Sequence, residues 1–341
     1  MKSIVQHYHS PMEGKPMSIY ASVNVRKHVS RFAAVLCLCA GSLFMFTFGQ
    51  AQAAAPVQKT FKSPDDAIKS LIDAAKRGDT HALMAIFGPG SKDLVSSGDP
   101  VADKTAAEEF VRHYEEKNSL QQLSEKKVVL HVGNDDWPFP IPIEKIGKSW
   151  RFDTKAGKHE ILARRIGRNE LATIETCLVY VDAQHEYARK DRDKNGLLEY
   201  AQKFRSTPGQ RDGLYWDTKE GEEESPLGPL VAEASKEGYG RKQTPRQTTD
   251  ERTPYHGYYY RILKAQGSNA PGGAYDYVVD GKMIGGFALV AYPAKYGNSG
   301  VMTFVVNQDG VVYQKNLGKN TAKIAQAMEK FDPDSTWKKV K

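Results

Sequence analysis

Apolar residues change their spacing part of the way along the chain. Between residues 63 and 116 they recur every three or four positions, which is typical of one face of a helix and predicts three helices. From residue 126 to residue 152 the pattern becomes that of strands, with Gly147 and Lys148 as a hairpin turn. Helices followed by a meander predict a small α+β domain over residues 57–156.

A long helical stretch follows this first domain. It is expected to run from His159 to Lys190, with Leu171, Ile174, Leu178 and Val181 as its apolar stripe.

Strand signals dominate the last part of the chain. Four strand-like runs lie between residues 258 and 317, and Gln308-Asp309-Gly310 predicts a tight hairpin between the last two. A closing helix is expected over residues 321–329. The long helix and the antiparallel sheet therefore predict a second α+β domain over residues 157–331, followed by a basic tail at residues 332–341.

The N-terminal region carries an export signal. Basic residues precede an apolar run from Phe32 to Gly49, and Ala51-Gln52-Ala53 fits a small-x-small cleavage site. Residues 1–53 are therefore predicted to be a signal peptide, and the protein to be periplasmic or extracellular. The alternative is an uncleaved anchor, which would be the protein's link to the membrane.

Charge and cysteine content narrow the function classes. The net charge of +7 suggests a nucleic-acid partner, but residues 1–53 hold five of the 48 basic and one of the 41 acidic residues. The remaining chain has a net charge of only +3, so nucleic-acid binding is not predicted. Cys37 and Cys39 lie in the apolar run, which leaves Cys177 without a partner for an internal disulfide. Its apolar helical neighbours predict a buried, unreactive thiol.

One short motif resembles half of a calcium loop. Asp191, Asp193 and Asn195 alternate before a glycine, as calcium ligands do in an EF-hand. Glu199 falls where a ligand often acts through water, but Gln202 replaces the bidentate glutamate. The motif is therefore either a weak calcium site or a turn at which Asn195 and the glycine end the long helix. We favour the turn, and we expect no other cofactor.

A second motif combines a histidine with tyrosines. His256 precedes Gly257 and three tyrosines at a loop-to-strand junction, where functional side chains are often presented. Tyr258 and Tyr260 should share one face of the sheet. His256, Tyr258 and Tyr260 form the candidate binding surface, although a structural corner is the favoured interpretation. No nucleophile or carboxylate can be placed beside His256 from the sequence.

Several stretches resemble one bacterial family. "RRIGRNELATI", "PYHGYYYRIL" and "GVMTFVVNQDGVVYQKNLG" are similar to the family called domain of unknown function 2950. The resemblance covers nearly the whole chain after the signal, and it implies an exported, two-part protein without established catalytic residues. The second half also resembles type IV pilins and pseudopilins, and the first half resembles cystatin-like or nuclear-transport-factor-like domains.

These features predict an exported cell-envelope protein that works as a non-enzymatic binding or assembly module with an unidentified envelope partner. One alternative is a hydrolase or other enzyme that uses the His256 region. Another is a structural protein stabilised by calcium. Enzyme function is disfavoured because the catalytic motifs are incomplete: the His-Glu pairs at residues 159 and 185 lack the second histidine of a zinc protease.

Overall fold

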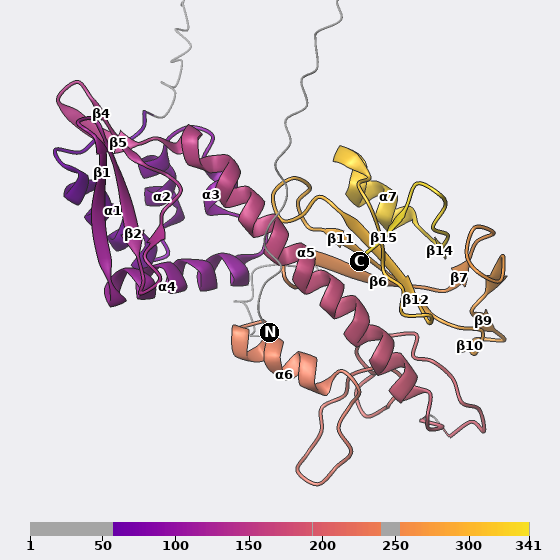
Figure 1. Ribbon diagram of the computed structural model, residues 1–341. Helices are drawn as coiled ribbons and strands as arrows, with labels where there is room; N and C mark the ends of the chain where they lie inside the picture. The colour runs from indigo at the N-terminus through magenta and orange to yellow at the C-terminus, as the bar shows by residue number, and fades with distance from the viewer. Residues whose placement is uncertain (1–56, 193, 240–252, 341) are drawn as a thin grey trace, which may run out of the picture. The chain divides into compact units, whose positions relative to one another are not determined.

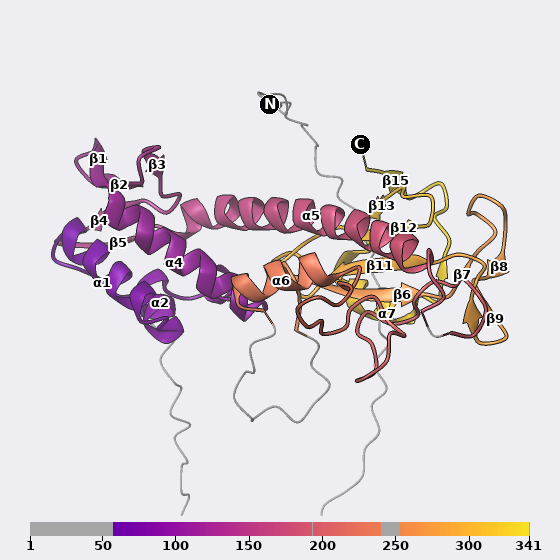
Figure 2. The ribbon, with the colours of Figure 1, turned by 90° about the horizontal axis from the view of Figure 1, so that it is seen from below.

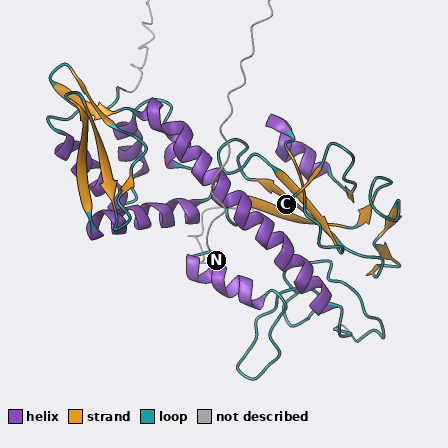
Figure 3. Cartoon of the chain, viewed as in Figure 1, coloured by secondary structure: helices purple, strands orange, loops and turns teal. Residues whose placement is uncertain are grey.

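The computed structural model describes residues 57–192, 194–239 and 253–340. These residues form helices and several mainly antiparallel sheets, so the fold is α+β as predicted (Figure 3). No helix in the described ranges is long and apolar enough to cross a membrane. Phe32 to Gly49, the expected signal core, lies outside the described residues.

The chain begins with helices whose ends are encoded locally. Ser63 caps the first of them, because its hydroxyl accepts the Asp66 N–H at 3.1 Å and Pro64 occupies the first helical position. Asp79 caps the second in the same way through the N–H of Ala82, at 2.9 Å. The four helices are α1 (Pro64–Lys76), α2 (Thr80–Phe87), α3 (Lys92–Val95) and α4 (Pro100–Glu116).

An antiparallel sheet follows these helices. Its strands are β1 (Asn118–Ser124), β2 (Lys127–Val132), β3 (Trp137–Pro138), β4 (Ile143–Ile146) and β5 (Ser149–Phe152). The order is β1-β2-β4-β5, with β3 paired to β2, and the predicted hairpin joins β4 to β5. Helices α1, α2 and α4 lie on one face of this sheet (Figure 2).

The first hydrophobic core lies between these helices and this sheet. Phe152 is only 1% exposed, and its ring meets that of Phe87 edge-on with centroids 5.4 Å apart. Trp150 packs against this core but is only half-buried, and the Lys145 ammonium lies 5.7 Å from its ring centroid. Trp150 lies nearer the exposed hairpin turn than Phe152 does, and large rings are seldom completely covered.

Helix α5 (Thr154–Tyr187) is the longest helix described (Figure 1). It begins five residues before the predicted His159 and ends before Lys190. Asp153 caps it by accepting the Ala156 N–H at 3.2 Å. The first domain boundary at residue 156 therefore falls inside the first turns of this helix.

The predicted apolar stripe of α5 is wrong in part. Leu171 is 70% exposed and Leu178 is 43% exposed. The buried residues of the helix are instead mostly small or polar, namely Gly157, Thr173, Thr176, Cys177, Tyr180, Val181, Ala183, Gln184 and Tyr187. Thr173 and Thr176 satisfy their hydroxyls on carbonyls four residues earlier, at 2.7 and 2.8 Å, which permits their burial. Hydropathy therefore does not mark the packed face.

The second sheet has the strand order β15-β13-β12-β11-β6 and is antiparallel throughout. Its strands are β6 (Tyr258–Leu263), β11 (Ala288–Pro293), β12 (Thr303–Asn307), β13 (Tyr313–Lys315) and β15 (Lys338–Lys339). This confirms the four main strand-like runs and the last hairpin. The sheet lies between α5 and α7 (Thr321–Ala327), as Figure 2 shows.

Short elements complete the second part. Helix α6 (Gly228–Glu237), which the sequence pattern did not reveal, comes before β6 in the chain. The remaining short strands are β7 (Ala265–Gln266), β8 (Tyr275–Asp276), β9 (Val278–Val279), β10 (Lys282–Met283) and β14 (Lys330–Phe331), with a 3-10 turn, η1, at Gly318–Asn320. The pilin-like sheet order expected from the sequence is not confirmed.

The described residues contain two separate hydrophobic cores but belong to one compact unit. Polar contacts connect the two cores. Arg165 of α5 donates to the carbonyls of Asp93 and Leu94 and to the side chain of Asn298, and Lys295 pairs with Asp93. Independent folding of residues 57–156 and 157–331 therefore stays a prediction.

Candidate functional site

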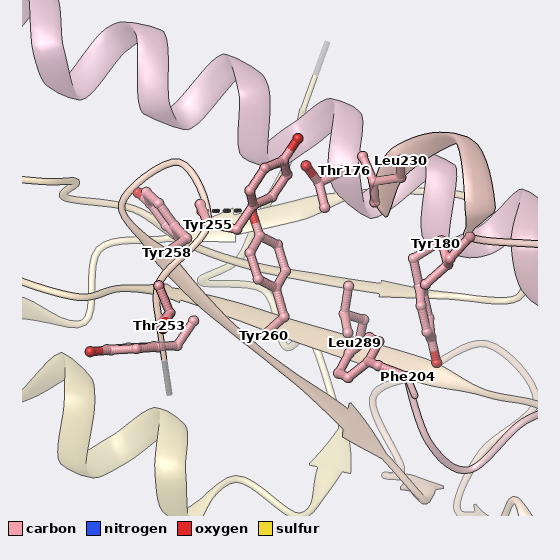
Figure 4. A pocket seen from close by; sticks show the side chains of 11 residues that line it. Thr176, Tyr180, Phe204, Leu230, Thr253, Tyr255, Tyr258, Tyr260 and Leu289 are labelled. Carbon is pink, nitrogen blue, oxygen red and sulfur yellow. Dashed lines mark hydrogen bonds between the residues drawn. The ribbon is translucent and has the colours of Figure 1, made fainter. Parts of the chain in front are cut away.

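A cavity of about 210 Å³ is bounded by α5, α6, β6 and β11 (Figure 4). Six of its eleven lining residues are aromatic, and the lining consists of Thr176, Tyr180, Phe204, Leu227, Leu230, Thr253, Tyr255, Tyr258, Tyr259, Tyr260 and Leu289. Figure 4 shows Tyr258 and Thr253 on one side and Tyr180 and Phe204 on the other, with Tyr255, Tyr260 and Thr176 between them. The site is therefore concave and mainly apolar, as small-molecule sites usually are.

Two local features of the sequence create this space. Strand alternation turns Tyr258 and Tyr260 toward α5, where the Tyr260 hydroxyl lies 3.4 Å from the Thr173 hydroxyl. Thr173 and Thr176 are small residues on the facing side of α5. A leucine at the lining position Thr176 would reach farther into the space, so the threonine opposite the tyrosines leaves room for the cavity.

The hydroxyl groups of this cavity are poor acids and bases. Burial raises the pKa of Tyr258 well above its usual range, and the nearby Glu170 adds to that effect. Burial likewise raises the pKa of Tyr260. Both phenols stay protonated at neutral pH, and no described lining residue is a carboxylate, histidine, cysteine or lysine. The cavity can hold a ligand, but its walls offer no group to move a proton.

His256 lies next to this cavity and is not part of its lining. Its backbone has φ 49°, and its imidazole Nε2 is 3.8 Å from the Glu237 carboxylate. Its ring lies against that of Tyr255 in a tilted arrangement, with centroids 4.1 Å apart. The structure thus brings Tyr258 and Tyr260 together in the cavity wall and places His256 behind Tyr255. Tyr258 is completely buried, so it forms a wall and not an exposed surface.

A buried carboxylate holds the turn that precedes β6. Asp99 is fully buried, and its Oδ1 accepts the N–H groups of Val101 and Ala102, both at 3.1 Å. Its Oδ2 accepts the Tyr239 hydroxyl at 2.8 Å and the Gly257 N–H at 2.9 Å. Sequence reasoning missed Asp99 as part of the site. An aspartate before a proline does indicate a helix cap, but nothing in the sequence indicates partners about 150 residues away.

The calcium motif forms a compact turn. Asp191 Oδ1 accepts the Asn195 N–H at 3.0 Å, and Oδ2 accepts the Gly196 N–H at 2.8 Å. Asn195 donates to the Glu199 carboxylate at 2.7 Å, and Lys282 lies 3.2 Å from the same oxygen. Within the described ranges, no group of three His, Cys, Asp or Glu residues is arranged to hold a metal ion. Asp193 lies outside the described residues.

The predicted helix stop at Asn195 is wrong in its position. Helix α5 ends at Tyr187, and Ala188 is its C-cap. The turn at residues 191–196 is a separate feature, with Lys194 at φ 60° and Gly196 at φ 87°. The carboxylate of Asp191 stabilises this turn through its two backbone contacts, which an aspartate can do without a metal.

Millimolar calcium is expected to raise the melting temperature of the protein only slightly. Lys282 partly neutralises Glu199, and Gln202 supplies no carboxylate, so any affinity must be low. At a tenfold excess over Kd the stabilisation would be about 1.4 kcal/mol. Differential scanning calorimetry with calcium, with magnesium at equal ionic strength, and with the Asp191→Ala variant measures this. A large calcium-specific shift that survives Asp191→Ala would rule out this loop as its source.

Glu199 also lines a second, polar cavity of about 290 Å³. Its charged residues are mostly paired: Lys203 contacts Asp212 at 2.5 Å, and Lys282 contacts Glu199. Burial opposes ionisation of Asp212, but hydrogen bonds from Lys203 and Thr207 outweigh it and lower the pKa of Asp212 to about 2. Because these charged side chains are already paired with one another, this cavity is a weaker candidate for a ligand site than the tyrosine-lined cavity.

Cys177 is expected to resist thiol reagents in the folded protein. It is fully buried, and burial raises the pKa of its thiol to about 12. Labelling with iodoacetamide at pH 8, followed by peptide mass spectrometry, should therefore modify the Cys177 peptide only after denaturation. Rapid labelling without denaturant would show that the helix opens locally and that the thiol is accessible.

Comparison with known proteins identifies the family of the chain. No curated protein and no solved structure matches it. The pilin-like, cystatin-like and nuclear-transport-factor-like resemblances are accordingly not confirmed. A family described as "Protein of unknown function (DUF2950)" matches residues 58–340, which is well over half of the chain. The chain therefore belongs to the DUF2950 family.

Proposed function

We propose that this protein is an exported, non-enzymatic binding protein of the cell envelope that takes a small, largely apolar ligand into the tyrosine-lined cavity. The observation that carries the proposal is the composition of the cavity wall. Aromatic and aliphatic side chains dominate it, and the hydroxyls present belong to tyrosines and threonines. Such a wall favours burial of apolar surface, which is the main driving force for binding small molecules.

The size of the cavity sets the size of the ligand. A cavity of about 150 Å³ lined by apolar side chains can accommodate benzene. The cavity here measures about 210 Å³, so it can hold a substituted benzene ring or an indole. Aromatic walls add a preference for flat rings, because edge-to-face and offset contacts contribute beyond the area buried.

The chemistry of the surrounding residues argues against the enzyme alternative. A hydrolase that used the His256 region would need a nucleophile or a general base within hydrogen-bond reach of the substrate. Cys177 is fully buried with a raised pKa, and His256 does not line the cavity. The Tyr258 and Tyr260 phenols, with their raised pKa values, remain neutral. Binding without turnover is the function that these residues support best.

A cavity-filling variant tests the proposal. Indole and p-cresol should each bind the purified protein at one site, as measured by isothermal titration calorimetry. Thr176→Phe places a ring in the cavity and should abolish that binding. Leu171→Phe adds a ring to the same helix at a position that is 70% exposed, and it should bind as the wild type does. Equal binding by all three proteins, or by none, would overturn the proposal.

Export of the protein should be accompanied by cleavage of the predicted signal peptide. The apolar run and the Ala51-Gln52-Ala53 pattern support cleavage that leaves a chain beginning near Ala54. Intact-mass measurement of the protein from its producing cells should show that N-terminus in the envelope or medium. An intact chain beginning near Met1 or Met17 in the cytosol would contradict the proposal.

A further inference from the structure

We propose that the tyrosine-lined cavity selects an organic cation, a ligand with a substituted ammonium group on a small apolar body. The inference rests on the proposed binding function and adds the charge of the ligand. Tyrosine faces attract cations through the ring quadrupole, and carboxylates surround this cavity on more than one side.

Helix α6 places two of these carboxylates. Leu230 lines the cavity, and Glu233 and Glu237 follow three and seven residues later, on the same stripe of the helix. The Glu237 carboxylate lies 3.8 Å from the His256 imidazole, whose ring contacts that of Tyr255. Glu237 is thus separated from the cavity wall by little more than one ring.

Helix α5 supplies a third carboxylate near the same tyrosine. Glu175 immediately precedes Thr176, which lines the cavity, and it is solvent-exposed. Burial raises the pKa of Tyr255, and Glu237, Glu233 and Glu175 raise it further, in that order. Three carboxylates, on α5 and α6, therefore lie near Tyr255 among the described residues.

A fourth carboxylate lies behind Tyr258. Glu170 Oε1 accepts the N–H groups of Val301 and Met302 at 2.9 and 3.0 Å, which fixes its position. Glu170 also contributes to the raised pKa of Tyr258. Because Tyr258 donates its hydroxyl to the Met302 carbonyl at 3.0 Å, its ring stays in place as part of the wall. Among the described residues that line the cavity, none is lysine or arginine.

These charges decide which ligands the cavity accepts. A cation against several tyrosine faces gains an attraction that a neutral molecule of the same shape lacks, and an anion is repelled by the carboxylates. The cation–ring attraction alone corresponds to a preference of about 5- to 30-fold over a neutral isostere. The carboxylates add a component that weakens with ionic strength.

A matched pair of probes tests the charge preference. Choline and 3,3-dimethylbutan-1-ol have nearly the same shape, since a quaternary carbon replaces the nitrogen. Choline should bind the purified protein at least about fivefold more tightly in calorimetric titrations, and its advantage should shrink in 0.5 M KCl. Thr176→Phe should abolish the binding of both probes.

Variants locate the origin of the preference. Glu233→Gln combined with Glu237→Gln should weaken choline binding severalfold and leave the alcohol unaffected, whereas Glu329→Gln, at an exposed position near the end of α7, should change neither. Tyr255→Leu should weaken choline more than the alcohol. Equal affinities of the two probes would overturn the cation inference while leaving the binding function intact. Absence of binding by choline, the alcohol, indole and p-cresol alike would overturn both.

Discussion

Replacing Phe152 with alanine is expected to unfold the first hydrophobic core. Phe152 is 1% exposed, and its ring contacts those of Phe61, Phe87 and Phe139. Truncating a buried phenylalanine to alanine typically costs about 3–5 kcal/mol, because the apolar transfer energy is lost and a cavity remains. That amount is a large fraction of the stability of an ordinary domain.

The same variant tests whether the two cores unfold separately. Hydrogen exchange measured by mass spectrometry across a urea series follows peptides from both cores in one sample. Loss of protection in β2 and β5 well before β11 and β12 would establish two units. Leu120→Ala is the matched control, because Leu120 lies on the exposed edge strand β1 and is 37% exposed. Simultaneous loss of protection in both sheets would show one cooperative unit.

Whether the two cores unfold separately depends on the contacts between them. Lys295 Nζ meets the Asp93 carboxylate at 2.5 Å, and the hydrogen bond from Lys295 outweighs partial desolvation to lower the pKa of Asp93. Both side chains are more than 40% exposed, and exposed ion pairs contribute little, about 0–1 kcal/mol. Arg165 donates to two backbone carbonyls from a partly buried position, and hydrogen bonds of a charged group contribute more than an exposed ion pair.

Local signals in the sequence located the elements that depend on local chemistry. Ser63 and Asp79 begin α1 and α2 because their side chains accept N–H groups within the same turn. The β4–β5 hairpin turns at Gly147, which has φ 61°. Such features depend on neighbours a few residues apart, so their patterns are visible in the sequence.

Packing between segments that are distant in the chain is less visible in the sequence pattern. Leu171 and Leu178 were expected on the buried side of α5 but are exposed, whereas the polar Thr173, Thr176 and Gln184 are buried. The Gln184 side-chain amide makes two hydrogen bonds with the backbone of Ala201. Its NH₂ group donates to the Ala201 carbonyl and its oxygen accepts the Ala201 N–H, both at 2.8 Å. A polar residue can be buried when it finds such partners, and the partners lie too far along the chain for periodicity to reveal.

The candidate site was predictable to the same limited extent. Strand alternation predicts Tyr258 and Tyr260 on one face, because that spacing is a property of any strand. Both residues line the cavity, and so does Tyr259 between them. Tertiary packing brings other lining residues to the cavity, and no sequence motif indicates them: Tyr255, Leu230 and Thr176. His256 drew notice as a titratable residue, but its neighbour Tyr255 is the residue that reaches the cavity.

Asp99→Ala is expected to destabilise the protein by roughly 3–7 kcal/mol. The change removes a helix cap worth about 1 kcal/mol. It also leaves the Tyr239 hydroxyl and the Gly257 N–H without their acceptor, at a cost of about 1–3 kcal/mol for each buried group. Asp99→Asn should cost less, because its amide oxygen can still cap α4 while its NH₂ group faces the Gly257 N–H. Urea denaturation followed by circular dichroism measures both values.

Ligand binding should weaken in the same variants even where they remain folded. Asp99 holds Gly257, the residue before β6, and β6 supplies Tyr258 and Tyr260 to the cavity wall. Asp99 also holds Tyr239, whose ring packs on that of Tyr255 with centroids 5.0 Å apart. Tyr239→Phe is the control, because it removes one hydroxyl but keeps the ring and the Asp99–Gly257 contact, so it should cost only about 1 kcal/mol. Choline and indole titrations of Asp99→Asn at a temperature where it is fully folded should therefore give weaker binding than titrations of Tyr239→Phe. Unchanged affinity in Asp99→Asn would mean that the buried carboxylate stabilises the fold without positioning the cavity wall.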